Sequence, residues 1–281
     1  MESLTIKTLI QTALNEDIGS GDITTDNLID AHQTGEGVLI AKEPLVLAGM
    51  DVARQVFDCL DAGIQFRAML SDGDTAASGD TLAHVQGKLT ALLKAERTAL
   101  NFLQRLSGIA TNVAGYVQKV QGTTVRLVDT RKTIPGWRVL EKYAVRVGGG
   151  SNHRMGLYDG VLIKDNHIAA FGGIAGAIVH IRKHVSHLLK IEVEVSNLDE
   201  VTEAREAGAD VIMLDNMSLK EVREAVAVIQ HAALVEVSGN VTRADLLDLA
   251  HTGVDIISIG ALTHGARAVD ISMQIESAEK S

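Results

Sequence analysis

The chain has 281 residues, of which 46% are hydrophobic and 3% aromatic, and its formal net charge is -10. This length suits one large domain or two smaller ones with a substantial buried core. The acidic balance and scarce aromatics argue against nucleic-acid binding, no apolar run approaches membrane length, and the N-terminus lacks a signal-peptide layout. The single cysteine, Cys59, excludes an internal disulfide and a cysteine-based zinc site. We interpret it as a core residue of a helix, and we expect a reduced, cytoplasmic setting.

The first hundred residues mix helices and strands without regular alternation. Apolar residues at helical spacing predict a helix over Ser3–Asn15. Further elements are predicted as strands at Gly35–Ala41, Leu45–Ala48, Ile64–Met69 and Thr81–Gly87, with a helix at Met50–Leu60. This order indicates a small α+β layer. A long helical pattern at Leu92–Val120 follows, in which Arg105 reads as a solvated helix cation.

After Val120 the pattern changes to alternating strands and helices. Apolar runs occur at Val125–Val128, Val161–Ile163, Ile191–Val195, Val211–Leu214, Leu234–Val237 and Ile256–Ile259, and helical stretches are predicted at Trp137–Val147, Gly173–Leu189, Leu198–Ala207, Leu219–His231 and Arg243–His251. Repeated βα units with short connections imply a parallel sheet, either closed as a barrel or doubly wound. The alternating tail at Asp270–Ile275 is expected to return to the N-terminal layer.

Polar residues at the strand ends favour the barrel, since barrel enzymes build their sites there. The runs are followed by Asp129-Thr130-Arg131-Lys132, Lys164-Asp165-Asn166-His167, Asp215-Asn216, Ser238-Gly239-Asn240 and Gly260-Ala261-Leu262, while Glu192 and Glu194 alternate within the third. The last two groups have the composition of phosphate cradles, with a helix expected to begin just after Asn240.

Cations concentrate in the middle of this acidic chain. The window Arg126–Lys164 holds eight Lys/Arg and only three Asp/Glu. Cations packed this closely predict a pocket for a highly anionic small molecule. The alternative, a solvated basic helix face, fits Arg138, Lys142 and Arg146. The pocket hypothesis requires Arg131, Arg154 and Lys164 to converge.

Metal binding has two candidate donor sets. A zinc centre formed by His153, His167 and His264 is disfavoured, because the flanking Arg and Lys residues would oppose a dication. Glu194 and Asp215 are better placed to hold Mg²⁺, directly or through water, or to bind ribose hydroxyls. Composition and spacing therefore indicate transfer chemistry at a phosphorylated sugar.

Long motifs in one order resemble the quinolinate phosphoribosyltransferase family. They are E-D-I-G-S-G-D-I-T-T, E-R-T-A-L-N-F-L-Q-R-L-S-G-I-A-T, D-T-R-K-T-I-P-G, E-K-Y-A-V-R-V-G-G-G-S-N-H-R-M-G-L-Y-D, L-I-K-D-N-H, E-V-E-V, M-L-D-N-M, E-V-S-G-N and G-V-D-I-I-S-I-G-A-L-T-H. The likeness spans nearly the whole chain. It departs from the commonest pattern at Ile134, Trp137 and Ser151, none of which removes a charged ligand.

The resemblance implies an N-terminal α/β sandwich at 1–110, joined by the tail 269–281, and an open α/β barrel of about seven strands at 111–268. It implies Mg²⁺-dependent transfer of phosphoribosyl from phosphoribosyl pyrophosphate to quinolinate with decarboxylation, giving nicotinate mononucleotide, CO₂ and pyrophosphate in de novo NAD synthesis. It also implies a homodimer, or a hexamer, whose active site is shared between subunits.

The same resemblance assigns roles to individual residues. Quinolinate would be bound by Thr130, Arg131, His153, Arg154 and Lys164, with Arg97 from the partner subunit. Phosphoribosyl pyrophosphate and Mg²⁺ would be held by Lys132, Lys164, Glu194 and Asp215, and the 5′-phosphate by Ser238, Gly239, Asn240, Gly260 and Ala261. Catalytic roles would fall to Lys132, Lys164, Glu194 and Asp215.

Two alternatives stay open at the sequence level. One is a paralogue of the same fold encoded with molybdate-transport genes. The other is a phosphate-binding barrel lyase or isomerase that does not use phosphoribosyl pyrophosphate.

Overall fold

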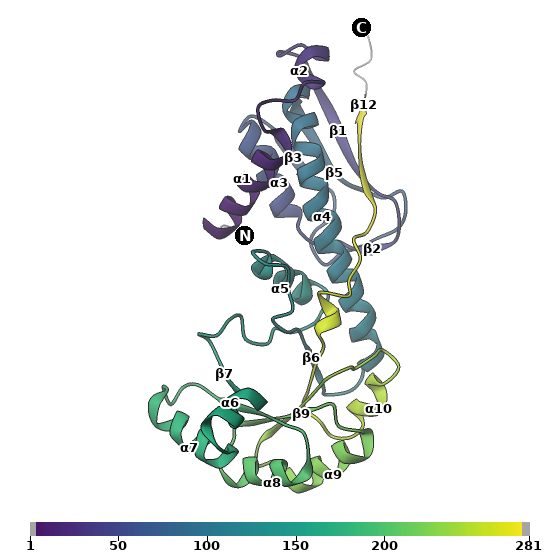
Figure 1. The fold of residues 1–281 in the computed structure, drawn as a ribbon. Coiled ribbons are helices and arrows are strands. Elements are labelled where there is room, and N and C mark those ends of the chain that lie inside the picture. Colours follow the sequence, from purple (N-terminus) through teal and green to yellow (C-terminus); the bar gives the residue numbers. More distant parts are fainter. Residues whose placement is uncertain (1–3, 277–281) are drawn as a thin grey trace. The chain divides into compact units, whose positions relative to one another are not determined.

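A computed structural model describes residues 4–276 as a mixed α/β protein (Figure 1). The chain divides into two compact units: Met1–Ala114, Ile134–Gly149 and Ala266–Ser281 form the first, and Gly115–Thr133 and Gly150–Gly265 form the second. The sequence had assigned 111–268 to the barrel, whereas the structure groups the segment 134–149 with the N-terminal unit. No described helix is both long enough and apolar enough to span a bilayer.

The first unit is built on an antiparallel sheet. Its helices are α1 (Leu4–Ile18), α2 (Thr25–Leu28), α3 (Met50–Leu60), α4 (Leu89–Val117, ending in the second unit) and α5 (Arg138–Val147), and its strands are β1 (Thr34–Ala41), β2 (Leu45–Val46), β3 (Gln65–Ala68), β4 (Thr75–Ala76), β5 (Thr81–Lys88) and β12 (Ile271–Glu276). The main sheet has the order β12-β1-β5-β3, and β2 pairs with β4. Helix α1 buries Ile6, Ile10 and Leu14, whose spacing of four places them on one face.

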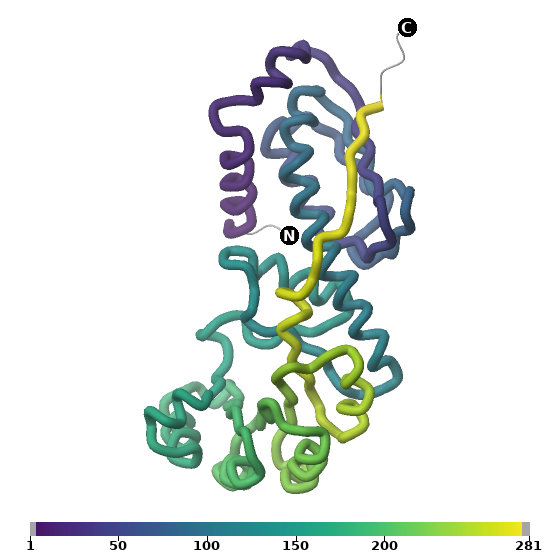
Figure 2. Tube along the Cα trace, turned by 45° about the vertical axis from the view of Figure 1, so that its right-hand side comes forward, coloured from purple at the N-terminus to yellow at the C-terminus, as the bar shows by residue number. Residues whose placement is uncertain are grey.

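The C-terminal strand lies in the N-terminal sheet. Strand β12 pairs antiparallel with β1 from Glu36↔Glu276 to Ala41↔Ile271, and the two run side by side in Figure 2. The backbone leading to β12 passes against α4 at Gly108, where an added Cβ would lie 2.1 Å from the Arg267 carbonyl oxygen. A side chain at that position would block this approach. Residues 277–281 of the expected tail lie outside the described residues.

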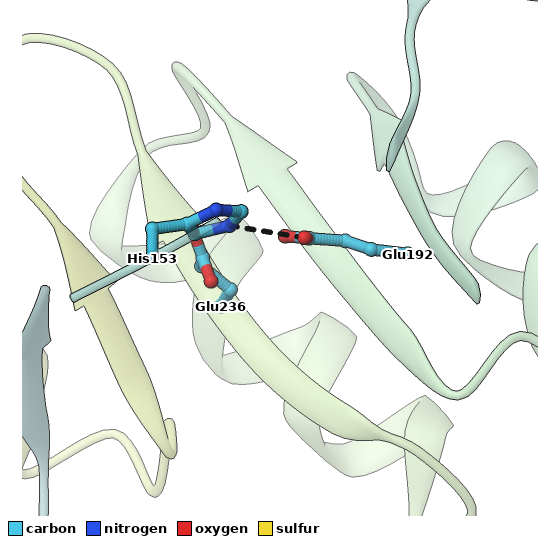
Figure 3. A group of neighbouring side chains, drawn as sticks. All are labelled: His153, Glu192 and Glu236. Carbon is cyan, nitrogen blue, oxygen red and sulfur yellow. Dashed lines mark ion pairs between the residues drawn. The ribbon is translucent and has the colours of Figure 1, made fainter. Parts of the chain in front are cut away.

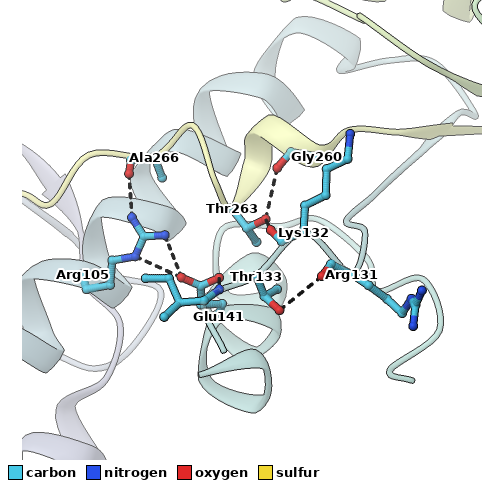
Figure 4. A network of polar contacts seen from close by, with 9 residues as sticks. Arg105, Arg131, Lys132, Thr133, Glu141, Gly260, Thr263 and Ala266 are labelled. Atoms are coloured by element: carbon cyan, nitrogen blue, oxygen red, sulfur yellow. Dashed lines mark hydrogen bonds and ion pairs between the residues drawn. The ribbon is translucent and has the colours of Figure 1, made fainter. Parts of the chain in front are cut away.

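Arg105 is a partly buried residue that pairs with a fully buried carboxylate, which corrects its interpretation as a solvated helix cation. Its Nη2 lies 2.7 Å from Oε1 of Glu141, which is 0% exposed, and its Nη1 donates to the Ala266 carbonyl oxygen at 2.7 Å (Figure 4). The backbone N–H of Ile134 donates to the other Glu141 oxygen. Lys142 is also fully buried, so the solvated basic face was wrong for this residue. Cys59, expected in the core, is exposed.

The second unit carries a six-stranded parallel sheet in the order β6-β11-β10-β9-β8-β7. Its strands are β6 (Arg126–Val128), β7 (Val161–Ile163), β8 (Ile191–Val195), β9 (Val211–Asp215), β10 (Leu234–Ser238) and β11 (Ile256–Ser258). Strands β6 and β7 end the order, so the barrel is open, as predicted. In place of the seventh strand that was expected, a single bridge joins Ser151 to Val128.

Helices follow most of these strands. They are α6 (Asp165–Phe171), α7 (Ile174–His184), α8 (Leu198–Glu206), α9 (Leu219–Ile229) and α10 (Leu246–Ala250), with short 3₁₀ turns η1 (Gln118–Val120) and η2 (Gly260–Leu262). Neighbours α7, α8 and α9 pack in succession along the sheet (Figure 1). Helix α6 was missed, because Asp165, Asn166 and His167 had been interpreted as strand-end residues and instead form its first turn.

Candidate anion-binding site

One hollow of about 720 Å³ collects the polar carboxyl ends of the parallel strands. Arg131, Arg154 and Lys164, which the pocket hypothesis required to converge, all line it. The other candidate residues that line it are Thr130, Lys132, His153, Glu194, Asp215, Ser238, Gly239, Asn240, Gly260 and Ala261. Parallel strands bring their carboxyl ends to one edge of the sheet, which explains how residues up to 131 positions apart meet (Thr130 to Ala261).

Arg97 is the one predicted site residue that does not line this hollow. It is an exposed residue of α4 in the first unit. The resemblance assigns Arg97 to the site of a partner subunit.

A buried aspartate fixes the loop that carries His153 and Arg154. Asp129 follows β6 and is 0% exposed; its carboxylate accepts from the Asn152 amide at 2.6 Å and from the His153 backbone N–H at 2.9 Å. Bonds to a carboxylate are stronger than those between neutral groups. Asp129 thus holds the loop against the sheet without reaching the hollow itself.

Arg154 is held in place before any ligand arrives. Its Nη1 donates to the Gly160 carbonyl oxygen at 3.0 Å, and its backbone N–H donates to Nδ1 of His153 at 2.8 Å. Partial burial and the nearby Arg131 cation lower the pKa of the Arg154 guanidinium, while Glu192 and Asp159 oppose that shift. Two guanidinium groups that repel each other within one hollow favour an anion between them.

Two carboxylates stand at adjacent strand ends. Lys164, at the end of β7, contacts Oε2 of Glu194 on β8, and Asp215 at the end of β9 accepts from the Asn216 side-chain amide at 2.7 Å. Carboxylate oxygens are the donors that Mg²⁺ prefers. The donor set of Glu194 and Asp215 therefore fits Mg²⁺, and the contact of Glu194 with Lys164 favours binding through water.

The backbone after β10 forms a tight turn at Gly239, where a side chain would collide with Asn216. We call this turn the Gly239 cradle. Gly239 has φ +90°, and a Cβ there would lie 2.3 Å from Oδ1 of Asn216, which itself accepts from the Asn240 amide at 3.0 Å. Asn216 and Asn240 also have positive φ, at 54° and 49°. Such strained backbone is concentrated at functional sites.

The helix expected just after Asn240 is absent from that place. Helix α10 begins only at Leu246 and has five residues, so the predicted contribution of a helix N-terminus to this cradle was wrong. The bare Gly239 backbone and the Ser238 hydroxyl are the remaining anion donors there.

Gly260 and Lys132 line the hollow at the ends of β11 and β6. A Cβ at Gly260 would lie 2.8 Å from Cδ of Lys132, so the lysine stem passes directly over this glycine. The Thr263 hydroxyl donates to the Lys132 carbonyl oxygen at 2.7 Å and fixes its backbone (Figure 4).

Sequence reasoning missed several lining residues, among them Glu236, Ser258 and His264. His264 had been considered only as a zinc ligand and His167 lies outside this hollow, so His153, His167 and His264 do not form the triad weighed above. Glu236 is the most informative omission, because it lies inside an apolar run. An acidic residue in the middle of a buried strand was the signal that could have revealed it.

The fold and the site together define an open α/β-barrel protein with a pocket for an anionic, phosphorylated ligand. Two family profiles match consecutive parts of the chain: "Quinolinate phosphoribosyl transferase, N-terminal domain" at residues 22–107 and "Quinolinate phosphoribosyl transferase, C-terminal domain" at residues 109–274. The chain belongs to the quinolinate phosphoribosyl transferase family.

Several known proteins are similar to this chain in sequence or structure over almost their full length. The probable nicotinate-nucleotide pyrophosphorylase (carboxylating) of Bacillus subtilis is 42% identical over 98% of this chain and 95% of its own, and that of Mycobacterium leprae, which carries the name without "probable", is 41% identical over 95% of both. The structure of NadC from Streptococcus pyogenes superimposes with a TM-score of 0.95 at 41% identity, over 99% of each chain. The nicotinate-nucleotide pyrophosphorylase structure from Francisella tularensis has a TM-score of 0.93 at 42% identity, over 97% of this chain and 96% of its own.

Proposed function

We propose that this chain transfers phosphoribosyl from phosphoribosyl pyrophosphate to quinolinate and decarboxylates the adduct, giving nicotinate mononucleotide, CO₂ and pyrophosphate for NAD synthesis. The observation that carries the proposal is the convergence of Arg131, Arg154 and Lys164 on one hollow that also contains the Gly239 cradle. Cations suited to two carboxylates thus lie beside a backbone suited to a phosphate.

The chemistry asks for positioning more than for an activated side chain. The pyridine nitrogen of quinolinate is already a nucleophile, and Arg131, His153 and Arg154, with Thr130, would orient it toward ribose C1. Lys132 and Lys164 would offset the negative charge of the leaving pyrophosphate. Orientation and preorganised charge of this kind supply most of the acceleration in such transfers.

Decarboxylation follows from the product of the first step. The N-ribosylated ring carries a cationic nitrogen beside the C2 carboxylate, so the bond to CO₂ breaks and leaves its electron pair at C2, where the cation stabilises it. One proton must then be added at C2. Lys164 or a water molecule is the proposed donor.

Magnesium would be held by Glu194 and Asp215. At Glu194 it would bind through water, because Lys164 already contacts that carboxylate. When bound, Mg²⁺ would neutralise charge on the diphosphate. The protein residues would keep the diphosphate and the ribose hydroxyls in register with the 5′-phosphate, which Ser238, Gly239, Asn240, Gly260 and Ala261 would hold.

The function is tested by incubating the purified protein with quinolinate, phosphoribosyl pyrophosphate and Mg²⁺. We expect nicotinate mononucleotide, CO₂ and pyrophosphate in equal amounts, and loss of activity when Mg²⁺ is chelated. Binding of quinolinate without product would favour an accessory protein, and turnover of a sugar phosphate without pyrophosphate release would favour a lyase or isomerase.

Gly239→Ala is expected to raise KM for phosphoribosyl pyrophosphate about tenfold or more, because the new methyl group would displace Asn216 from the phosphate cradle and strain the backbone by roughly 1–3 kcal/mol. KM for quinolinate should change little. Gly208→Ala is the matched control: it has φ +78° but open space around its Cβ position. Equal effects of the two substitutions on KM would remove Gly239 from the phosphate site.

We further propose that the active site is shared across a homodimer, within a dimer or a hexamer, and that Arg97 reaches quinolinate from the partner subunit. The exposed position of Arg97 on α4 supports this. We also propose a cytoplasmic location, in keeping with a single, unpaired cysteine.

Mixing two inactive variants tests the shared site. Arg97→Ala and Arg131→Ala should each abolish turnover, and hybrid dimers should regain one intact site. Random pairing predicts recovery of about a quarter of wild-type activity. If mass spectrometry shows that subunits have exchanged and no activity returns, Arg97 does not act across the interface.

A further inference from the structure

Three titratable side chains meet between strands of the parallel sheet, beneath the proposed quinolinate pocket. His153 Nε2 lies 3.0 Å from Oε2 of Glu192 on β8 and 3.7 Å from Oε1 of Glu236 on β10 (Figure 3). The two glutamates are 7% and 1% exposed. We call these three residues the acid-pair cluster.

The two carboxylates lie close together in a poorly solvated part of the sheet. The facing ligand atoms of the cluster all lie within 4.8 Å of one another. Among the described residues, Oε1 of Glu192 and Oε1 of Glu236 are buried without a hydrogen-bond partner. Like charges in so small a buried volume favour one shared proton. Consistent with this, burial and the Glu192 charge raise the pKa of Glu236 to about 7.

The hydrogen-bond network also assigns the tautomer of His153. The backbone N–H of Arg154 can only donate, and it points at Nδ1 of His153 at 2.8 Å. Nδ1 must therefore present a lone pair, which leaves the ring proton on Nε2, facing Glu192. Oε2 of Glu192, 3.0 Å away, is the acceptor for that proton.

Other charged groups surround the cluster on both sides. On the side of the active-site hollow, the charged groups include Arg131 and Arg154. His153, Arg154 and Glu236 also line a second hollow of about 430 Å³, whose other charged groups are Arg126, Asp159 and Lys190. The cations outnumber the acids around the pair. A negative charge on Glu236 would offset the cations that quinolinate needs.

A divalent metal explains the cluster less well than a proton does. Two ligand atoms on a tetrahedral zinc ion would be about 3.3–3.5 Å apart, given Zn–N and Zn–O bonds of roughly 2.0–2.1 Å. The 3.0 Å between His153 Nε2 and Glu192 Oε2 is instead an ordinary hydrogen-bond distance.

We propose that Glu192 and Glu236 are positioning residues of the quinolinate site: Glu236 carries a proton, and the two glutamates together hold His153 as its Nε2–H tautomer beside Arg154. This inference rests on the proposed function for its kinetic consequence. The tautomer and the proton are properties of the protein without substrate.

Kinetics with Glu236→Gln provide the first test, because glutamine keeps the shape of the protonated acid but cannot ionise. Wild-type turnover is established first. Glu236 loses its proton as pH rises from 7 to 8.5. If quinolinate binds only when Glu236 is protonated, KM for quinolinate should rise by up to about tenfold per pH unit over this range. In Glu236→Gln, KM for quinolinate should stay level over the same pH range. KM for phosphoribosyl pyrophosphate serves as the internal control and should not distinguish the two proteins.

The second test needs no turnover. Nitrogen-15 NMR of labelled histidine, with His153→Ala to assign the signal, should show the Nε2–H tautomer in wild type and in Glu236→Gln. Glu192→Leu, which removes the acceptor of the Nε2 proton, should raise KM for quinolinate at least tenfold with a smaller change in kcat. Parallel pH profiles for wild type and Glu236→Gln would overturn the proposal. So would a Zn²⁺ or Mn²⁺ site, measured by calorimetry, that Glu236→Gln abolishes.

Discussion

Arg154→Ala is expected to weaken quinolinate binding by about 2–5 kcal/mol, roughly 30- to 5,000-fold. The guanidinium is held in advance by the Gly160 carbonyl oxygen and lies in the same hollow as Arg131 and Lys164. Its removal would leave a substrate carboxylate without its partner in a partly dehydrated site. The measurement is the quinolinate dissociation constant by calorimetry, together with KM.

A matched control separates local binding from net charge. Arg223 is an exposed residue of α9 outside the hollow, so Arg223→Ala removes the same charge from the same unit. We expect this control to bind quinolinate with wild-type affinity. If Arg154→Ala did so too, the carboxylate-binding role of Arg154 would be wrong.

Arg105→Ala is expected to destabilise the fold by about 3–5 kcal/mol, because it leaves the fully buried Glu141 carboxylate without its cation. The shift in the urea unfolding midpoint, monitored by circular dichroism, measures the effect. Stability should partly recover in Arg105→Ala/Glu141→Gln, where the stranded charge is also removed.

Arg54→Ala is the surface counterpart of that substitution. Arg54 pairs with Asp51 at 2.6 Å and with Asp58 at 3.4 Å, but its side chain is 45% exposed. Solvent-exposed pairs of this kind contribute about 0–1 kcal/mol. Equal midpoint shifts for the two arginine variants would contradict the assignment of Arg105 as the partner of a buried carboxylate.

The barrel and most of its site were predictable, for a physical reason. A strand buried on both faces is a short apolar run, and the parallel sheet sends every following polar residue to one edge. Runs such as Val161–Ile163 and Ile191–Val195 therefore located β7 and β8 to the residue. Convergence of Arg131 and Lys164 followed from topology, whereas Arg154 reaches the hollow on a loop that Asp129 fixes.

What escaped prediction depends on partners that are distant in sequence. Arg105 and Glu141 are 36 residues apart, and helical periodicity does not reveal which charged residue a neighbouring helix will cover. Helix α6 was missed because Lys164, its N-cap, directly follows a strand, so its polar first turn resembled a strand end. In the acid-pair cluster, Glu192 lies on β8 and Glu236 on β10, the two strands that flank β9. The two side chains become neighbours only when the sheet forms.

In the proposed site, the clustered cations bind a ring with two carboxylates beside phosphoribosyl pyrophosphate. The most direct test compares quinolinate with nicotinate, which lacks the C2 carboxylate. The measurement is the ratio of kcat/KM for the two acids at saturating phosphoribosyl pyrophosphate and Mg²⁺. We expect quinolinate to be preferred at least ~100-fold, since nicotinate would leave cations of the hollow without a carboxylate partner. Comparable kcat/KM values for the two acids would show that the hollow does not recognise the second carboxylate.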